Sequence, residues 1–322
     1  MEPRVDLAIS VVNYNQKAMT VDCLRSLLEA PPECTCEVYV VDNGSSDGSA
    51  DRIAALFPTV RLIRNDANLG FAKAHNQVLR LDNSRYVLLL NNDTTLFPKT
   101  LDILVAFMDA HPQAGLAGCR ILNPDGTLQP STYGSLSVAK TFLRMVGLRR
   151  LFPKGALWRR AISALPLSLQ HHFPGYWQHD TVREVKSVMG AFFLMRREAV
   201  RQAGLLDETM FMYNEEGEWA YRARAAGWKV YFVPITGIIH YGGPFKLRKG
   251  FQPRLFVEKH KGLLHIFKKH HTPAEFMLAK WIIVSSFAFK LAFWFAAWPF
   301  SPANANLRIR TYREIIEMAY RF

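Results

Sequence analysis

The first 95 residues contain four short apolar runs, and each run stops abruptly at polar side chains. The runs cover residues 5–12, 37–41, 60–63 and 86–90, and strand, polar loop and helix are expected to repeat in that order. This alternation is typical of an α/β fold with a mostly parallel, Rossmann-like sheet flanked by helices. Ligands bind beyond the carboxyl ends of parallel strands, so the polar residues after these runs are candidate site residues.

The fourth run, Tyr86–Leu90, ends in Asn91-Asn92-Asp93. A carboxylate at a strand end suits a divalent cation, because Mg²⁺ prefers oxygen ligands and is often shared with substrate phosphates. An Asn/Asp-rich turn that only ends the strand explains the same three residues. The other segments of the chain favour the cation.

The loops after the first two runs suit a nucleotide. Asn13-Tyr14-Asn15 follows the first run without the GxGxxG pattern of a dinucleotide fold, which disfavours a dehydrogenase. The second run leads into Asp42 and a loop rich in Gly, Ser and Asp. Asp42 could accept hydrogen bonds from a base or ribose while loop N–H groups face phosphate. An ordinary loop between strand and helix is the alternative.

An acidic centre follows later in the chain, where Glu215, Glu216 and Glu218 come after an apolar Met-Phe-Met-Tyr run. Acidic residues complement the dipole at a helix start, but three within four positions exceed that need. A carboxyl group in partly apolar surroundings can act as a general base. His240 ends a further apolar run, and its place after the acidic centre favours a ligand over a structural histidine.

The positive charge of the chain is concentrated towards its C-terminus. Residues 241–322 hold 14 Lys/Arg and 4 Asp/Glu, which is +10 of the formal net charge of +13. This asymmetry predicts a basic region beside a nearly neutral domain, with an anionic partner such as a nucleic acid, a membrane surface or a phosphate-bearing substrate. The four cysteines form no CxxC pair and the N-terminus has no signal-peptide core, so a reduced, cytosolic protein is expected.

Two segments suggest contact with an acceptor or a membrane. Residues 135–180 are expected to form an irregular, basic insertion, for which acceptor binding, membrane contact and a lid stay open. Phe276–Phe300 is apolar enough and long enough to span a bilayer, but Lys290 near its middle would cost about 2.5–3.5 kcal/mol there. A helix or helical hairpin lying in the cytosolic leaflet is therefore favoured over a span. A packed dimer helix is the alternative for the amphipathic segment after Pro302.

Taken together, the motifs resemble the inverting, nucleotide-sugar-dependent glycosyltransferases of family 2, and more narrowly their bacterial rhamnosyltransferase-like branch. The resemblance covers about residues 5–245 and implies a GT-A fold for residues 1–245, followed by a basic, apolar, helical, membrane-associated region over 246–322. The matching segments are VVNYN (11–15), VVDNGSSDGS (40–49), NLGFAKAHNQ (68–77), LLLNNDT (88–94), GAFFLMRREA (190–199), DETMFMYNEEGEWAYRARAAGW (207–228) and PITGIIH (234–240).

The resemblance also implies roles for individual residues. Asp93 matches the carboxylate that binds Mg²⁺ or Mn²⁺, and His240 matches a histidine that completes the metal site in some members. Glu216 matches the catalytic base, but the family usually has Asp there, which leaves Glu215 as the alternative. The nucleotide-sugar site is expected to comprise Asn13, Asn15, Asp42, Ser45, Asn68, Gly70, Asn76 and Asn92. The acceptor side is expected to comprise Gly190, Ala191 and Glu218.

The activity implied by the resemblance is an inverting, divalent-metal-dependent sugar transfer to a hydroxyl of a cell-envelope glycan or lipid-linked saccharide. The preferred donor is dTDP-rhamnose; a UDP-sugar donor and a non-catalytic, membrane-bound nucleotide-sugar sensor are the alternatives. The expected location is the cytoplasmic face of the inner membrane, peripheral or monotopic. A nucleic acid is not expected as partner, because the C-terminal aromatic residues cluster in an apolar run. A nucleotidyltransferase would need a basic, glycine-rich first loop. Acceptor, linkage and homo-oligomer formation stay open.

Overall fold

A computed structural model describes residues 5–29, 31–134, 136–147, 156–166, 177, 179–242 and 251–322. The chain divides into two compact units, which are described separately. The sheet unit comprises Met1–Gly134, Arg159–Phe211 and Glu215–Lys249, and the helical unit comprises Ser135–Trp158, Met212–Asn214 and Gly250–Phe322. The domain boundary predicted at 245/246 lies outside the described residues, as does much of the predicted insertion over 135–180.

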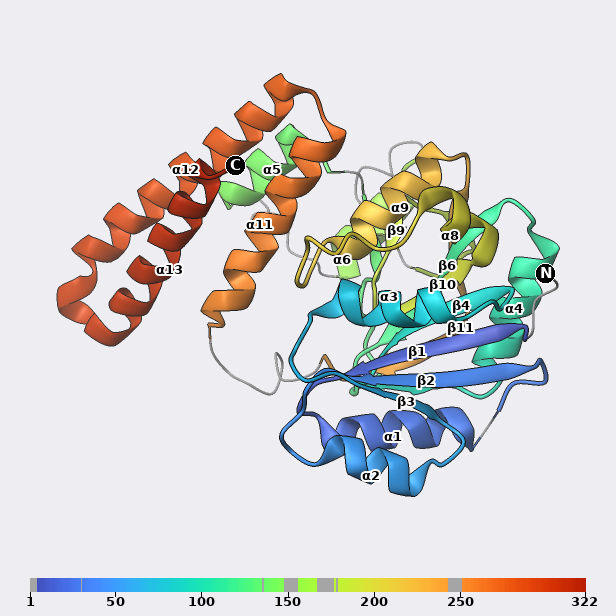
Figure 1. The fold of residues 1–322 in the computed structure, drawn as a ribbon. Coiled ribbons are helices and arrows are strands. Elements are labelled where there is room, and N and C mark those ends of the chain that lie inside the picture. The colour runs from blue at the N-terminus through green and yellow to red at the C-terminus, as the bar shows by residue number, and fades with distance from the viewer. Residues whose placement is uncertain are drawn as a thin grey trace. The chain divides into compact units, whose positions relative to one another are not determined.

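The sheet unit is built around one mixed β-sheet (Figure 1). The strands are β1 (Leu7–Asn13), β2 (Cys36–Asp42), β3 (Arg61–Arg64), β4 (Tyr86–Asn91), β5 (Thr94–Leu96), β6 (Ala114–Leu122), β8 (Arg183–Glu184), β10 (Phe192–Arg196) and β11 (Lys229–His240). Among the described residues their order is β3-β2-β1-β4-β10-β6-β11-β5, and β8 pairs with β11. β7 (Thr132–Tyr133) and β9 (Ser187–Val188) form a separate antiparallel pair.

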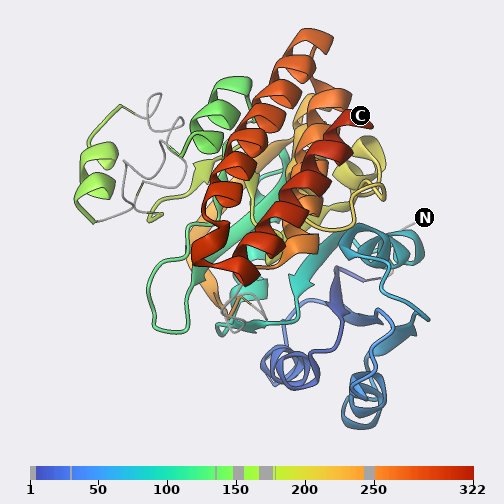
Figure 2. The same cartoon turned by 90° about the vertical axis from the view of Figure 1, so that its left-hand side faces the viewer.

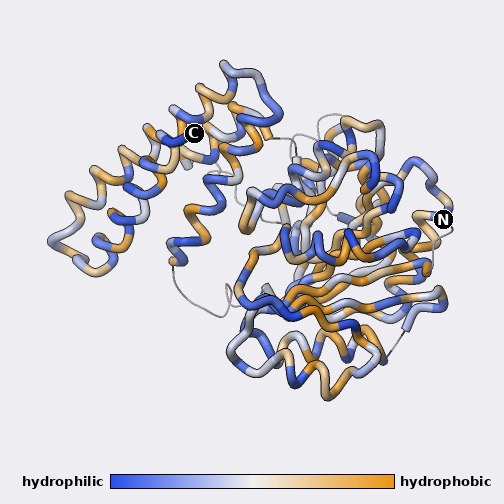
Figure 3. Tube along the Cα trace, in the orientation of Figure 1, coloured by the Kyte–Doolittle hydropathy of each residue, from blue (hydrophilic) through white to orange (hydrophobic). Residues whose placement is uncertain are grey.

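Helices cover both faces of the sheet and enclose two apolar layers. One layer packs α1 (Lys17–Leu28), α2 (Ser49–Leu56) and α4 (Thr100–Ala110) against the strands, and the other packs α3 (Phe71–Leu81), α8 (Arg197–Ala203) and α9 (Glu215–Ala225). Successive strand side chains enter opposite layers, which explains why the strands read as continuous apolar runs. Figure 3 shows these strands in the hydrophobic colours. The predicted α/β class with a central sheet flanked by helices is confirmed.

Strand direction brings several polar strand ends to one edge of the sheet, which we call the rim. Asn13 is in register with Asp42, and Asn91 ends the parallel strand on the other side of β1. β10 runs antiparallel to β4, so its amino end lies at this rim, where the Ala191 carbonyl accepts from Asn91 N–H (3.1 Å). β6 is antiparallel to β10 and β11 is parallel to β6, so β11 ends at the rim with His240. The apolar pattern of the sequence did not indicate the direction of β10.

The described part of the helical unit contains α5 (Val138–Met145), α11 (Pro253–His270), α12 (Pro273–Ala296), the 3₁₀ helix η2 (Trp298–Phe300) and α13 (Pro302–Tyr320). In Figures 1 and 2, α12 and α13 lie side by side as an antiparallel hairpin. Thr272 and Glu275 form a capping box that starts α12. Among the described residues, α12 is the one helix long and apolar enough to cross a membrane. This agrees with the predicted helical, membrane-associating region. The remaining helix, α6 (Ala156–Ser163), is a described part of the predicted insertion.

Candidate functional site

Asn13 is the centre of a buried hydrogen-bond network at the rim. Its amide nitrogen donates to Asp42 Oδ2 (2.7 Å) and Ser49 Oγ (2.7 Å). Its amide oxygen accepts from Thr20 Oγ1 (2.8 Å) and Asn92 Nδ2 (3.2 Å). Asn13 is 0% exposed and Asp42 is 3% exposed, so the polar atoms of the network are satisfied within the protein. The network fixes the position of the Asp42 carboxylate.

The second carboxylate oxygen of Asp42 orders the loop that follows β2. Asp42 Oδ1 accepts from Ser45 N–H (2.9 Å), and Ser45 Oγ accepts from Asn15 N–H (2.9 Å). Asn15 Oδ1 accepts from Ser46 N–H (2.8 Å), with Asn15 at φ 51° in the left-handed region that Asn tolerates. These bonds join the loops after β1 and β2. The structure therefore brings together the predicted residues Asn13, Asn15, Asp42, Ser45 and Asn92.

Asn68 and Gly70 form the entrance to α3. A Cβ at Gly70 would lie 2.3 Å from the Phe211 carbonyl oxygen, and φ is +83°, so this position requires glycine. Asn68 Oδ1 accepts from Gly70 N–H (3.0 Å), and the Asn43 amide lies 3.4 Å from the same oxygen. Asn68 thus connects this turn to the loop after β2. The contacts of Asn68 and Gly70 in this structure determine the backbone conformation of the turn.

Asp93 and His240 meet where β5 and β11 pair. His240 Nε2 lies 3.3 Å from Asp93 Oδ1, and both side chains are largely buried. His240 Nδ1 lies 2.8 Å from Gln129 Oε1, and in the neutral tautomer in which Nδ1 donates to this oxygen, Nε2 presents its lone pair towards Asp93. In this form the nearest donor to Nε2 is the amide of Asn91 at 3.4 Å. A carboxylate oxygen and an imidazole nitrogen whose lone pairs face each other can both act as ligands of one cation.

This pair fits a divalent ion that is shared with a substrate. Among the described residues, no three His, Cys, Asp or Glu side chains gather into a larger metal-binding cluster. Mg²⁺ is usually held by one or two carboxylates, with substrate phosphates and water as further ligands. Cys23 Sγ lies 3.6 Å from Thr94 Oγ1, and burial raises the pKa of this thiol to about 11, so it stays protonated. Asp93 and His240 are therefore the available ligands.

Glu215 and Glu216 form the start of α9 but differ in environment. Glu215 is buried at 4% exposure, whereas Glu216 is partly exposed. A Cβ built on Gly190 would lie 3.8 Å from Glu216 Cβ and 3.6 Å from Phe71 Cζ, which are ordinary contact distances. The Glu216 side chain therefore lies beside the Gly190 backbone, at the amino end of β10. Tyr133 is 40% exposed as a residue, and the desolvation of its phenol together with the charge of Glu216 raises the pKa of that phenol.

Other predicted residues have structural partners instead. Glu218 is fully buried and accepts hydrogen bonds from Arg222 at 2.8–3.0 Å, so it stabilises its own helix rather than facing an acceptor. Asn76 is fully buried, and its amide bonds the Leu206 backbone and the Glu208 carboxylate at 2.9–3.0 Å. Both side chains are used by internal packing, which a motif alone does not reveal. Ala191, at 1% exposure, contributes its carbonyl to the sheet.

The sequence interpretation did not single out several residues of this site. Thr20 and Ser49 complete the Asn13 network from the starts of two helices, where hydroxyl groups are common for local reasons. Gln129 orients His240 from a segment without periodicity. Ser49 lies in the polar loop after a predicted strand, which was an available signal, whereas nothing in the sequence pattern indicated Gln129.

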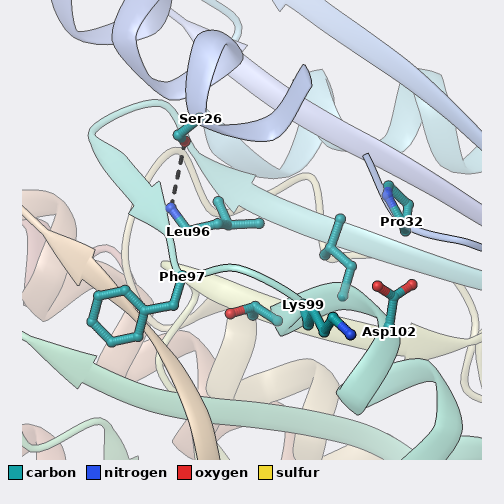
Figure 4. A pocket seen from close by; sticks show the side chains of 8 residues that line it. Ser26, Pro32, Leu96, Phe97, Lys99 and Asp102 are labelled. Atoms are coloured by element: carbon teal, nitrogen blue, oxygen red, sulfur yellow. Dashed lines mark hydrogen bonds between the residues drawn. The ribbon is translucent and has the colours of Figure 1, made fainter. Parts of the chain in front are cut away.

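A small hollow elsewhere in the sheet unit is a poor candidate for a substrate site. It lies beside β5 and the start of α4 and has a volume of about 10 Å³, close to the room that one water needs. Figure 4 shows Ser26 bonded to the Leu96 backbone on one side, with Lys99 and Asp102 opposite. The rim remains the candidate site.

Comparisons with known proteins agree with the architecture of the rim. The family model "Glycosyl transferase family 2" matches residues 8–204. The N-acetylglucosaminyl-diphospho-decaprenol L-rhamnosyltransferase of Mycobacterium tuberculosis is 29% identical over 248 residues, which is 73% of this chain and 76% of that protein. This relative is named for a rhamnosyl transfer to a lipid diphosphate saccharide.

Two solved structures share the fold at 16% sequence identity each. One is the mannosyltransferase PcManGT from Pyrobaculum calidifontis, solved with GDP-Man and Mn²⁺. The superposition has a TM-score of 0.55 and covers 99% of this chain and 87% of the PcManGT chain. GalNAc-T7, solved with UDP, GalNAc and Mn²⁺, has a TM-score of 0.58 and covers 83% of this chain, which spans 48% of that longer one. Because the family model matches more than half of the residues, the chain belongs to glycosyl transferase family 2 and is a glycosyltransferase with a GT-A-like fold.

Proposed function

We propose that this protein is an inverting, divalent-metal-dependent transferase that moves rhamnose from dTDP-rhamnose to a hydroxyl of a lipid-linked saccharide in cell-envelope synthesis. The observation that carries the proposal is the convergence on one rim of a buried nucleotide network, the Asp93–His240 pair and the Glu216 carboxylate. The name of the mycobacterial relative supports the sugar and the lipid acceptor. A UDP-sugar is the alternative donor.

The nucleotide is assigned to the loops after β1 and β2. Both oxygens of Asp42 are already oriented by protein donors, so the lone pairs that remain have a fixed direction towards a base or ribose. Asn15 is exposed beside this carboxylate, and Ser45 links the two. A site with this order loses little conformational entropy when the nucleotide binds.

Glu216 is assigned as the base that takes the proton of the acceptor hydroxyl. Inverting transfer needs one base on the face of the sugar opposite the leaving diphosphate, and its transition state resembles an oxocarbenium ion. Glu216 is the more accessible carboxylate of the pair and lies beside Gly190, whose backbone no side chain of its own shields from a reacting sugar. Buried Glu215 is assigned a supporting role. A positioned base contributes about 10²–10⁴-fold to the rate.

Asp93 and His240 are assigned as the protein ligands of Mg²⁺ or Mn²⁺, with Gln129 orienting the imidazole. A bound divalent cation would neutralise charge on the leaving diphosphate, so no protein acid is required there. The presence of Mn²⁺ in both of these solved structures supports this assignment.

The helical unit is assigned to the membrane. α12 is long and apolar enough for a bilayer, and a lipid-linked acceptor would be presented at its surface. We place the enzyme at the cytoplasmic face of the inner membrane. Removing residues 270–322 should release the protein from membranes and leave nucleotide binding intact, and persistent membrane association would contradict this assignment.

Release of nucleoside diphosphate tests the proposed activity directly. The full chain in detergent would be given dTDP-rhamnose, UDP-sugars or GDP-sugars, each with Mg²⁺, Mn²⁺ or EDTA, with and without a lipid acceptor extract. We expect release from dTDP-rhamnose that needs both the cation and the acceptor. Release from a UDP-sugar instead would select the alternative donor. Nucleotide binding without release from any donor would favour a sensor, and absence of nucleotide binding would overturn the assignments of Asp42 and Asp93.

A further inference from the structure

The middle of α12 is enclosed by other helices of its own unit. Phe287 is 0% exposed, and its ring lies 4.9 Å from that of His260 in α11 and 5.2 Å from that of Tyr312 in α13. Ile283 and Val284 are buried in the same cluster. If α12 crossed a bilayer with Phe287 at its centre, the helices that carry His260 and Tyr312 would have to enter the hydrocarbon with it. α11 carries several lysines and α13 several arginines, so this arrangement is costly.

The end of the hairpin where α12 leads into α13 is exposed instead of enclosed. No residue from 288 to 300 is buried. The aromatic side chains there are exposed to an unusual degree: Phe289 78%, Phe293 60%, Phe295 49%, Trp298 47% and Phe300 90%. Soluble proteins rarely expose so many neighbouring aromatic residues, and such patches mark surfaces for a partner or a membrane. We call residues 288–300 the aromatic tip.

Basic side chains without acidic counterparts lie along both helices of the hairpin. From residue 276 to residue 313 the sequence contains Lys280 and Lys290 in α12, the second within the aromatic tip, and Arg308, Arg310 and Arg313 in α13, and no Asp or Glu. The Arg313 guanidinium lies 5.7 Å from the Phe295 ring, and that of Arg308 lies 5.9 Å from the Trp294 ring. An anionic surface complements this charge, because each basic residue near anionic lipids adds attraction.

The spacing of these groups matches a shallow insertion. Arg308 lies six residues after Pro302, which starts α13 beside the tip, and this is about 9 Å along a helix at 1.5 Å per residue. Interfacial segments bury their apolar face about 5–10 Å into the boundary between headgroups and acyl chains. When the tip lies at that depth, Arg308 and Arg310 are level with the phosphates. The Trp298 indole N–H donates to Asn306 (3.0 Å), so it enters the interface already paired.

We infer that the α12–α13 hairpin is a monotopic membrane anchor, which inserts the aromatic tip into one leaflet of an anionic bilayer while α12 does not span it. This inference rests on the membrane part of the proposed function and names the segment, the depth and the lipid charge. The occupant of the tip is the lipid surface rather than a second copy of the chain, because the basic groups around the tip would repel their own copies.

Depth measurements at four exposed positions test the inference. Cys34 and Cys36 would be replaced by Ser, and single cysteines at Leu278, Phe289, Phe293 or Phe300 would carry an environment-sensitive NBD label. The full chain would be added to vesicles of phosphatidylcholine with or without phosphatidylglycerol, and acyl-chain-brominated lipids would report depth. We expect a blue shift and strong quenching at 293 and 300, weaker quenching at 289, none at 278, and a requirement for phosphatidylglycerol. A maximum near 289 with shallow ends would mean a span. No shift at any position, with self-association of the protein, would mean a dimer surface; either result overturns the inference.

Substitutions separate the tip from unrelated exposed apolar residues. F293D or F300D should weaken vesicle binding at least about tenfold, because an aromatic side chain that enters the lipid is replaced by a charged one. The matched control is L81D, which alters a 69% exposed apolar residue of the sheet unit and should leave vesicle binding unchanged. R310E should weaken binding to anionic vesicles only. Nucleotide binding measured on the same samples should not change. If the unsubstituted protein bound no nucleotide, the proposed function would be contradicted. The depth profile would still decide whether the hairpin is a monotopic anchor.

Discussion

The two halves of the rim are built on opposite plans. In the half proposed to bind the nucleotide, called here the nucleotide half, Asn13 and Asp42 are buried and their polar atoms bond one another and their neighbours. In the half proposed to bind the acceptor, called here the acceptor half, Glu216 is partly exposed and lies beside Gly190, where a Cβ would make only ordinary van der Waals contacts. A side chain whose polar atoms are bonded inside the protein is expected to contribute both to folding and to binding. A side chain that is partly exposed and loosely packed is expected to contribute to the chemistry with little effect on stability. Substitutions should therefore affect the two halves differently.

The largest effect is expected for Glu216. E216Q keeps the size of the side chain and removes the base, so kcat should fall about 10²–10⁴-fold with nucleotide affinity and the unfolding midpoint nearly unchanged. The matched control is E218Q, two residues away, which weakens a buried ion pair with Arg222 and should lower the unfolding midpoint while activity per folded molecule persists. Retention of more than a tenth of the activity in E216Q would transfer the role to Glu215.

Asn13 should show the coupled behaviour of the nucleotide half. N13A removes one hydrogen bond from each of Asp42, Ser49 and Thr20, which keep other partners, and each lost bond costs about 0.5–1.5 kcal/mol. We expect a lower urea midpoint and weaker nucleotide binding in the same variant. Urea unfolding and calorimetric titration would measure the two quantities. If stability fell without any change in nucleotide affinity, the network would be structural only.

Gly190 should show the uncoupled behaviour of the acceptor half. In G190A the new Cβ would lie 3.6 Å or more from Phe71 and Glu216, so the fold should tolerate it. A methyl group beside the reacting sugar should nevertheless lower kcat/KM by about tenfold. G118A is the matched control, because its Cβ would lie 2.8 Å from Val188 and should destabilise the protein. Normal kinetics in G190A would contradict the proposal that the reacting sugar approaches the backbone at this position.

The sequence indicated the position of the strand-end residues better than that of the helix residues, and the reason is physical. Asn13 and Asp42 end β1 and β2, Asp93 lies two residues after β4, and strand pattern together with strand direction determines where such residues meet. Glu218 and Asn76 face internal partners, which a motif does not reveal because a helix turns successive side chains through about 100° each. Gln129 was missed because it bonds His240 from a segment without periodicity, and only the fold brings the two together.

The smallest effect is expected for Asn15, the exposed member of the nucleotide half. N15G removes the hydrogen bond that Ser46 N–H donates to Asn15 Oδ1, while glycine keeps the left-handed backbone. The free energy of unfolding should therefore change by less than about 1 kcal/mol, and nucleotide affinity should fall a few-fold. N15A removes the same bond and adds about 1–2 kcal/mol of backbone strain at φ 51°. The difference in urea midpoint between the two variants therefore measures the backbone strain, and their shared loss of affinity measures the side chain. If N15G bound nucleotide as tightly as the unsubstituted protein, Asn15 would belong with the structural residues of the loop, and the nucleotide half would be entirely of the buried, coupled kind.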